Sequence, residues 1–146
     1  MSKIKKKSEI TLPQKVVGCI VGTPGIGKTT LALSAPKPLL LDCDNGIHRV
    51  QAEYRTDCVQ VESYEDILDV LQEDLSDYET IVIDTLGKLI EFMLDYFFNK
   101  DCELDTLYFY LTKIILIFSQ KTRQIFLINL SCSFSLFRYS FDSAFS

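Results

Sequence analysis

The sequence predicts an α/β domain with a mostly parallel central sheet that is covered by helices. Three short apolar runs, at 15–21, 39–42 and 80–84, are typical of strands that are buried on both faces. Segments with helical spacing of apolar residues separate or follow these runs. Alternation of strand and helix favours a parallel sheet.

The first two elements are a strand and a short helix. Residues 15–21 form a largely β-branched run that is apolar on both faces, so we expect a strand in the centre of the sheet. Residues 28–34 can begin a helix, and Pro36 and Pro38 then end it.

The second and third strands each end in a carboxylate. Residues 39–42 end at Asp42, and residues 80–84 end at Asp84. Ser63 and Asp66 between them have the spacing of a capping box, which predicts the start of an amphipathic helix. Its apolar face consists of Ile67, Leu68, Leu71 and Leu75. A further helix after the third strand would bury Leu86, Leu89, Ile90, Met93, Leu94 and Phe97.

Composition and charge exclude several classes of protein. A chain of 146 residues that is 47% hydrophobic is one ordered domain, and a net charge of −5 argues against a surface built wholly for nucleic acid. Five cysteines without a C-x-x-C pair favour reduced thiols. The basic N-terminus precedes no apolar stretch of signal-peptide length, and the apolar run 107–118 is too short to span a bilayer. We therefore expect a cytoplasmic protein without a membrane partner.

The composition changes near residue 105. Residues 106–146 contain seven of the ten phenylalanines and a single acidic residue, Asp142, against four basic ones. Residues 125–130 could form a fourth strand, whereas 131–146 show no period that we can assign. A truncated chain, or a C-terminal segment read in an altered frame, would explain this break.

Residues 22–29, Gly-Thr-Pro-Gly-Ile-Gly-Lys-Thr, match the pattern G-x-x-x-x-G-K-[ST] in full and lie between a predicted strand and a predicted helix. Glycines let the backbone N–H groups converge on phosphate oxygens. Lys28 can reach the β- and γ-phosphates of a nucleotide, and Thr29 can offer its hydroxyl to magnesium. The alternative is a glycine-rich turn that binds nothing. The residues expected to hold ATP are Gly22, Thr23, Pro24, Gly25, Ile26, Gly27, Lys28, Thr29 and Thr30.

Carboxylates at two strand ends complete the predicted site. Asp84, at the end of an apolar strand, has the position of a Walker B acid and is expected to bind magnesium with Thr29, unless it only caps the next helix. Of Asp42 and Asp44, we choose Asp44 to orient or deprotonate the attacking water; the alternative is an Asx turn with Asn45-Gly46. The catalytic set is thus Lys28, Asp44 and Asp84.

Three further residues are less distinctive. Arg49 and Arg55 could each stabilise charge in the transition state, and their spacing does not separate them. The single histidine, His48, has no second ligand at metal spacing and is expected to be a solvated loop residue.

The motif set resembles the phage and bacterial ATP-binding proteins of the AAA/RecA-like P-loop group, in particular the small phage recombination ATPases. The similar segments are 21–30, 37–46 and 80–86, and the resemblance covers about residues 14–98. It implies a RecA-like three-layer sandwich, incomplete at the C-terminus, that hydrolyses ATP with magnesium. It also implies single-stranded DNA or a recombination protein as partner, and assembly into a homo-oligomeric ring or filament.

The same resemblance places a catalytic base at Asp44, although relatives more often have Glu there. Relatives continue with a longer helix and a strand that ends in a polar sensor residue, a position that Asn129 could fill. Residues beyond about 100 do not otherwise match. We therefore expect a flexible basic arm at 1–13, a P-loop nucleotide-binding domain at 14–100 and an uncertain tail at 101–146. Two alternatives remain open: a nucleotide-binding remnant or regulatory module without turnover, and a P-loop kinase for a small molecule.

Overall fold

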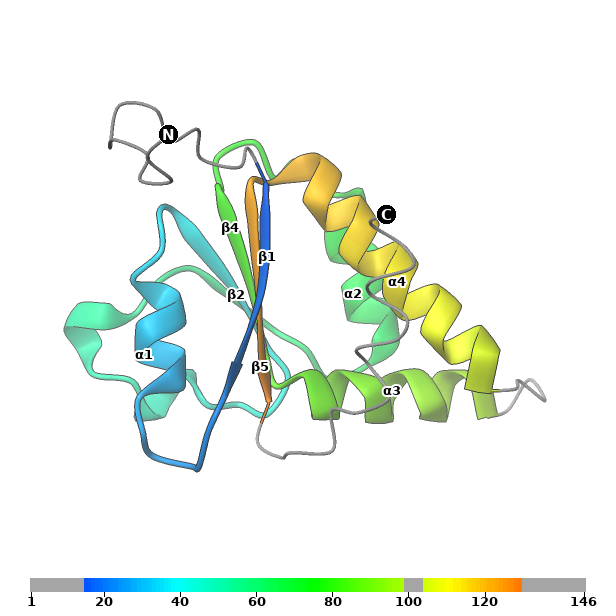
Figure 1. Cartoon of the computed structure of the whole chain (residues 1–146), viewed down its shortest axis with the longest axis horizontal. Coiled ribbons are helices and arrows are strands. Elements are labelled where there is room, and N and C mark those ends of the chain that lie inside the picture. Colours follow the sequence, from blue (N-terminus) through cyan, green and yellow to red (C-terminus); the bar gives the residue numbers. More distant parts are fainter. Residues whose placement is uncertain (1–14, 99–103, 130–146) are drawn as a thin grey trace, which may run out of the picture.

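A five-stranded, all-parallel sheet forms the centre of the molecule in the computed structural model, which describes residues 15–98 and 104–129 (Figure 1). The strand order across the sheet is β1-β5-β4-β2-β3, and all four neighbouring pairs are parallel. The strands are β1 (Val16–Val21), β2 (Pro38–Asp42), β3 (Cys58–Gln60), β4 (Thr80–Asp84) and β5 (Gln124–Asn129). The α/β class and the parallel sheet expected from the sequence are confirmed.

Helices cover both faces of the sheet and give three layers (Figure 1). One face carries α1 (Lys28–Leu33), together with the short 3-10 turns η2 (Ile47–Arg49) and η3 (Ala52–Tyr54). The opposite face carries α2 (Tyr64–Gln72), α3 (Leu86–Phe98) and α4 (Leu104–Lys121). Among the described residues, none of the helices has the length and apolar character that a bilayer span would need.

The core follows from alternation along the strands. In β4, Ile81 and Ile83 belong to the apolar cluster under α2, α3 and α4, whereas Val82 belongs to the cluster under α1. All three side chains are fully buried. Because successive side chains of a strand point to opposite faces, an apolar run such as 80–84 can support a helix layer on each side.

The start of α2 is fixed locally, as the sequence predicts. Ser63 is the N-cap, and its hydroxyl accepts a hydrogen bond from the backbone N–H of Asp66. The Asp66 carboxylate accepts in return from the backbone N–H of Ser63, at 2.8 Å. The backbone N–H of Glu62 donates to the same carboxylate at 2.8 Å, and this bond, followed by those with Ser63, lowers the pKa of Asp66. The capping box is therefore confirmed.

The position of β1 differs from the sequence prediction. We expected residues 15–21 in the centre of the sheet, but β1 is the first strand in the order and lies at an edge of the described sheet. Its side chains are only partly buried, and Val21 is 47% exposed. β5 lies between β1 and β4 and pairs with both.

Residues from the segment expected to be an uncertain tail contribute to the same sheet and core. The strand expected at 125–130 is β5, Gln124–Asn129. Phe118 of α4 and Ile125 of β5 are buried in the cluster that also contains the β4 side chains. A ring contact at Gly18 shows how closely β5 packs, because a Cβ there would lie 3.0 Å from Cε1 of Phe126. The segments 1–14, 99–103 and 130–146 lie outside the described residues.

Candidate nucleotide-binding site

The loop between β1 and α1 depends on glycine for its backbone angles. Gly25 and Gly27 have φ values of +81° and +89°, in the region that L side chains rarely adopt. A Cβ at either position would meet no atom within 4 Å, so the backbone angle and not crowding requires glycine. Gly27 is also the N-cap of α1, and its carbonyl accepts the first helical hydrogen bond, from Leu31.

Lys28, the first residue of α1, lies beneath this loop. Its side chain is largely buried, at 8% exposure, and its Nζ donates to the carbonyl oxygens of Gly22 (2.9 Å) and Thr23 (2.8 Å). A third hydrogen on the ammonium remains for another acceptor. The loop therefore places a positive charge against its own backbone, next to the N–H groups at the start of α1.

Thr29 connects the loop to the end of β4. Its Oγ1 donates a hydrogen bond of 2.6 Å to Oδ2 of Asp84, whose side chain is 5% exposed. Burial raises the pKa of Asp84, and the nearby Asp44 and Asp42 raise it further, against the opposing effects of Thr29 and Lys28. The peptide bond that follows Asp84 is cis. Burial and the two neighbouring acids make the ionised carboxylate of Asp84 costly.

The two acids after β2 have different surroundings. Asp42 is 2% exposed, and its carboxylate accepts from the backbone N–H groups of Gly46 (2.8 Å) and Ile47 (2.9 Å). Asp42 thus closes the turn that we had considered for Asp44. Asp44 lies within this turn, and its Oδ2 is 3.1 Å from Nη2 of Arg49.

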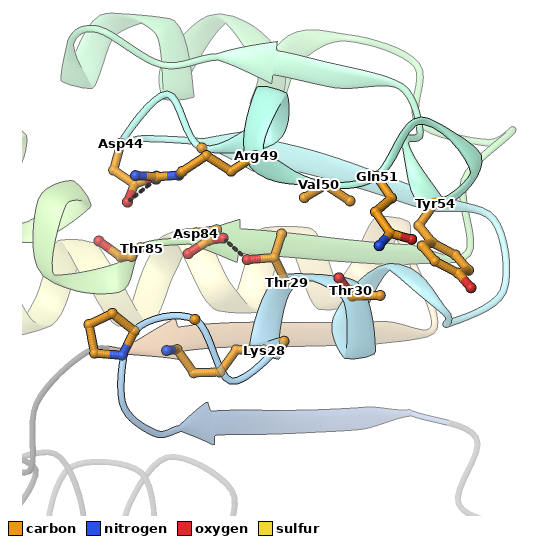
Figure 2. Close-up of a pocket in the computed structure, with 14 residues that line it drawn as sticks. Lys28, Thr29, Thr30, Asp44, Arg49, Val50, Gln51, Tyr54, Asp84 and Thr85 are labelled. Atoms are coloured by element: carbon orange, nitrogen blue, oxygen red, sulfur yellow. Dashed lines mark hydrogen bonds and ion pairs between the residues drawn. The ribbon is translucent and has the colours of Figure 1, made fainter.

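A pocket of about 630 Å³ lies between the loop and the ends of the parallel strands (Figure 2). Figure 2 shows Lys28 on one side, Asp44 and Arg49 on the other, and Thr29 with Asp84 between them. The lining consists of Pro24, Gly25, Gly27, Lys28, Thr29, Thr30, Asp44, Gly46, Arg49, Val50, Gln51, Tyr54, Asp84 and Thr85. Placement at the carboxyl ends of the strands is usual for ligand sites in open parallel sheets.

The pocket brings together most residues expected from the motif. Six of the nine expected loop residues line it, as do the expected acids Asp44 and Asp84. The other three are not among the lining residues: Gly22 and Thr23 supply the carbonyls that hold Lys28, and Ile26 is 69% exposed. The assignment of all nine residues to nucleotide binding stays a prediction.

Sequence reasoning missed one wall of the pocket. Val50, Gln51 and Tyr54 come from the region of η2 and η3, which has no recognisable motif. Gly46 had a weak signal, because Asn45-Gly46 is a typical turn pair. Only the fold shows that this region lies on the same face of the sheet as α1 and lines the pocket.

The oxygen atoms of Thr29 and Asp84 fit a magnesium ion that is also bound by the phosphates of a nucleotide. Thr29 and Asp84 offer a hydroxyl and a carboxylate, the hard oxygen ligands that Mg²⁺ prefers. Within 15–98 and 104–129, no group of three or more His, Cys, Asp or Glu side chains could hold a metal ion. A protein that contributes one or two oxygens and leaves the other positions to phosphate and water suits Mg²⁺ better than Ca²⁺ or Zn²⁺.

The family model described as AAA domain matches residues 14–108, which is more than half of the chain. The chain belongs to the AAA domain family. Among curated proteins, the comparison found no match.

Membership of the AAA domain family assigns the chain to the P-loop nucleotide-binding ATPases. The match begins just before β1 and ends inside α4, so it includes the loop with Lys28 and both strand ends that carry Asp44 and Asp84. In this AAA domain, β5 lies beyond the matched residues but between two strands of the matched part. The matched residues and the later strand β5 therefore form one sheet.

Proposed function

We propose that this AAA domain binds ATP with magnesium in the pocket described above and hydrolyses it, coupled to single-stranded DNA binding or recombination in a phage or bacterium. One observation carries the nucleotide part: the 2.6 Å hydrogen bond from Thr29 to Asp84. It brings the hydroxyl of the glycine-rich loop and a buried carboxylate to one point of the pocket wall.

Lys28 is the proposed ligand of the β- and γ-phosphates. Its ammonium is held at the loop by two carbonyls and lines the pocket. Burial makes its attraction to phosphate stronger than that of a solvated lysine, because screening by water is reduced. Backbone N–H groups from Gly25 to Thr29 would supply the remaining donors.

Thr29 and Asp84 are the proposed magnesium ligands. Magnesium would supply charge neutralisation for the phosphates. The raised pKa of Asp84 supports this role, because burial and neighbouring acids make its carboxylate costly to ionise without a cation nearby.

Asp44 is the proposed base for hydrolysis. It would accept a proton from water while the water oxygen forms a bond to the γ-phosphorus and the bond from that phosphorus to the bridging oxygen breaks, which leaves ADP and inorganic phosphate. Its location on the pocket wall opposite Lys28 supports this assignment (Figure 2).

A second candidate is nucleotide binding without turnover. One observation favours it: the Asp44 carboxylate is paired with Arg49, at 3.1 Å, and so is engaged in this structure. The DNA partner and the homo-oligomer are proposals that rest on the resemblance of segments 21–30, 37–46 and 80–86 to recombination ATPases.

The test measures ATP binding and phosphate release, with and without single-stranded DNA. Wild-type protein is compared with Lys28→Ala and with Lys113→Ala, a matched control in which an exposed lysine of α4 is removed. We expect ATP binding and DNA-stimulated release in the wild type and in the control. Lys28→Ala should bind ATP at least about tenfold more weakly, since a charged hydrogen bond contributes about 1.5–3 kcal/mol.

Each contrary outcome has a distinct meaning. Wild-type protein that binds no ATP contradicts the whole proposal. Tight binding without phosphate release in either condition indicates the second candidate. Release that DNA leaves unchanged contradicts the DNA part alone, and transfer of phosphate to an added nucleoside would identify a kinase.

A further inference from the structure

The two arginines that follow β2 have different tasks in the structure. Arg55 donates from Nε to the carbonyl of Val50 and from Nη2 to the carbonyl of His48, both at 2.9 Å. Its guanidinium therefore holds the turn together and does not line the pocket. Arg49 does line the pocket, and among the described residues the one partner of its guanidinium is Asp44.

The ion pair between Arg49 and Asp44 is easily exchanged. The Arg49 side chain is 63% exposed, and ion pairs of this kind contribute about 0–1 kcal/mol. Both side chains lie over Gly46, where a Cβ would be 2.7 Å from Nη2 of Arg49 and 2.8 Å from Oδ1 of Asp44. Glycine at this position thus leaves the space in which the two groups meet.

The charges around the pocket give Arg49 a stronger potential partner. Lys28 and Arg49 are the two cationic side chains on the described lining, on opposite sides of Thr29 and Asp84 (Figure 2). A γ-phosphate held near Thr29 would therefore lie between them. It carries more charge than a carboxylate and accepts two parallel hydrogen bonds from a guanidinium.

We propose that Arg49 binds the γ-phosphate of ATP and, by leaving Asp44, frees that carboxylate to act on water. With ADP the ion pair remains, and Asp44 stays engaged. This inference rests on the proposed ATP site. It makes Arg49 the residue that distinguishes ATP from ADP, and it makes the ion pair with Arg49 compatible with a role of Asp44 as base.

The experiment compares the dissociation constants of Mg-AMP-PNP, which cannot be hydrolysed at the γ position, and of Mg-ADP. Wild type, Arg49→Gln and Arg123→Gln are measured by titration calorimetry. Arg123 is an exposed arginine that pairs with Glu79, so its variant is a matched control for charge. We expect Arg49→Gln to weaken AMP-PNP binding about tenfold or more and ADP binding less than about twofold. Arg123→Gln should change neither.

A second variant excludes a purely structural role. Asp44→Asn removes the partner of Arg49, so AMP-PNP should bind as tightly as to wild type or more tightly. Weakening by Asp44→Asn equal to that by Arg49→Gln would overturn the inference. Arg49→Lys, which keeps the charge but not the paired donors, should fall between wild type and Arg49→Gln.

The failure of this inference is distinguishable from the failure of the proposed function. If wild type binds neither nucleotide, both are wrong. If wild type binds both and Lys28→Ala loses both, the ATP site holds; an Arg49→Gln variant that changes AMP-PNP and ADP binding alike, or changes neither, then refutes the role of Arg49 alone. Circular dichroism melting of each variant shows that the fold is retained.

Discussion

Thr29 and Asp84 are 55 residues apart in the chain, yet their side chains share a hydrogen bond of 2.6 Å. The strands that lead to them, β1 and β4, are not neighbours, because β5 lies between them. The loop after β1 and the start of α1 therefore bring Thr29 past β5 to the end of β4. Three separate parts of the chain must fold together before this pair can form.

Asp84→Asn should reduce the magnesium affinity of the ATP complex at least about tenfold, because a neutral amide oxygen replaces a carboxylate. Phosphate release would then need correspondingly higher magnesium concentrations. A magnesium titration of phosphate release at saturating ATP measures this. Asp69→Asn removes an exposed acid of α2 and should leave the titration unchanged. An unchanged midpoint in Asp84→Asn would remove Asp84 from the metal site.

The raised pKa of Asp84 predicts a pH dependence of stability in nucleotide-free protein. The folded state holds this proton more tightly than the unfolded state, whose pKa is near the ordinary 3.8, mainly because the group is buried. The contribution of Asp84 to the free energy of unfolding therefore falls as pH rises above 3.8 through the raised folded value.

Urea unfolding in EDTA, between about pH 4 and pH 7, measures this contribution. We expect Asp84→Asn to be more stable than wild type at pH 7, with a difference that shrinks toward pH 4. Magnesium with ATP should narrow the difference at pH 7, since a bound cation offsets the charge. A difference in stability that is constant from pH 4 to pH 7 would contradict a raised pKa of Asp84 in the folded state.

Substitution of Asp42 should mainly reduce stability, whereas substitution of Asp44, two positions away, should mainly reduce phosphate release. Asp42→Ala leaves two backbone N–H groups, of Gly46 and Ile47, without their acceptor, and should cost about 2 kcal/mol or more of unfolding free energy. Asp44→Ala breaks one exposed ion pair and should cost less than about 1 kcal/mol, while phosphate release falls about 100-fold or more. Urea unfolding and a phosphate-release assay on both variants measure the two effects. Equal losses of stability would contradict the division of roles.

Gly18→Val tests the contact between β1 and β5. The added side chain would meet the ring of Phe126, whose Cε1 is 3.0 Å from the position of a Cβ, and should destabilise the protein by about 1–3 kcal/mol. Cys19→Val, on the exposed side of the same strand, should have little effect. Phe126→Leu in the Gly18→Val background should recover part of the loss. If Phe126→Leu recovers no stability, the loss in Gly18→Val does not come from contact with the Phe126 ring.

The local elements could be predicted because their signals are short-range. Gly25 and Gly27, followed by Lys28 and Thr29, specify a turn and a ligand chemistry within a few residues. Ser63 and Asp66 likewise fix a helix start through bonds to each other. The apolar run that ends at Asp84 predicts a buried strand from its own composition.

The order of the strands could not be predicted in the same way. Both 15–21 and 124–129 are apolar runs, and neither run contains a signal that says which one lies at the edge of the sheet and which one inside it. The same limit applies to Arg49 and Arg55: each follows β2 in a short turn, and only the folded turn directs one to the pocket and the other to backbone carbonyls.

The α/β class, the glycine-rich loop and the acids at the strand ends can be derived from the amino-acid sequence, because each depends on residues close together in the chain. Tertiary structure alone decided that β5 separates β1 from β4, that Asp42 closes a turn while Asp44 lines the pocket, and that Val50, Gln51 and Tyr54 form its wall. These features depend on contacts between distant segments. Packing on a shared sheet brings such segments together, and local composition does not encode which of them will meet.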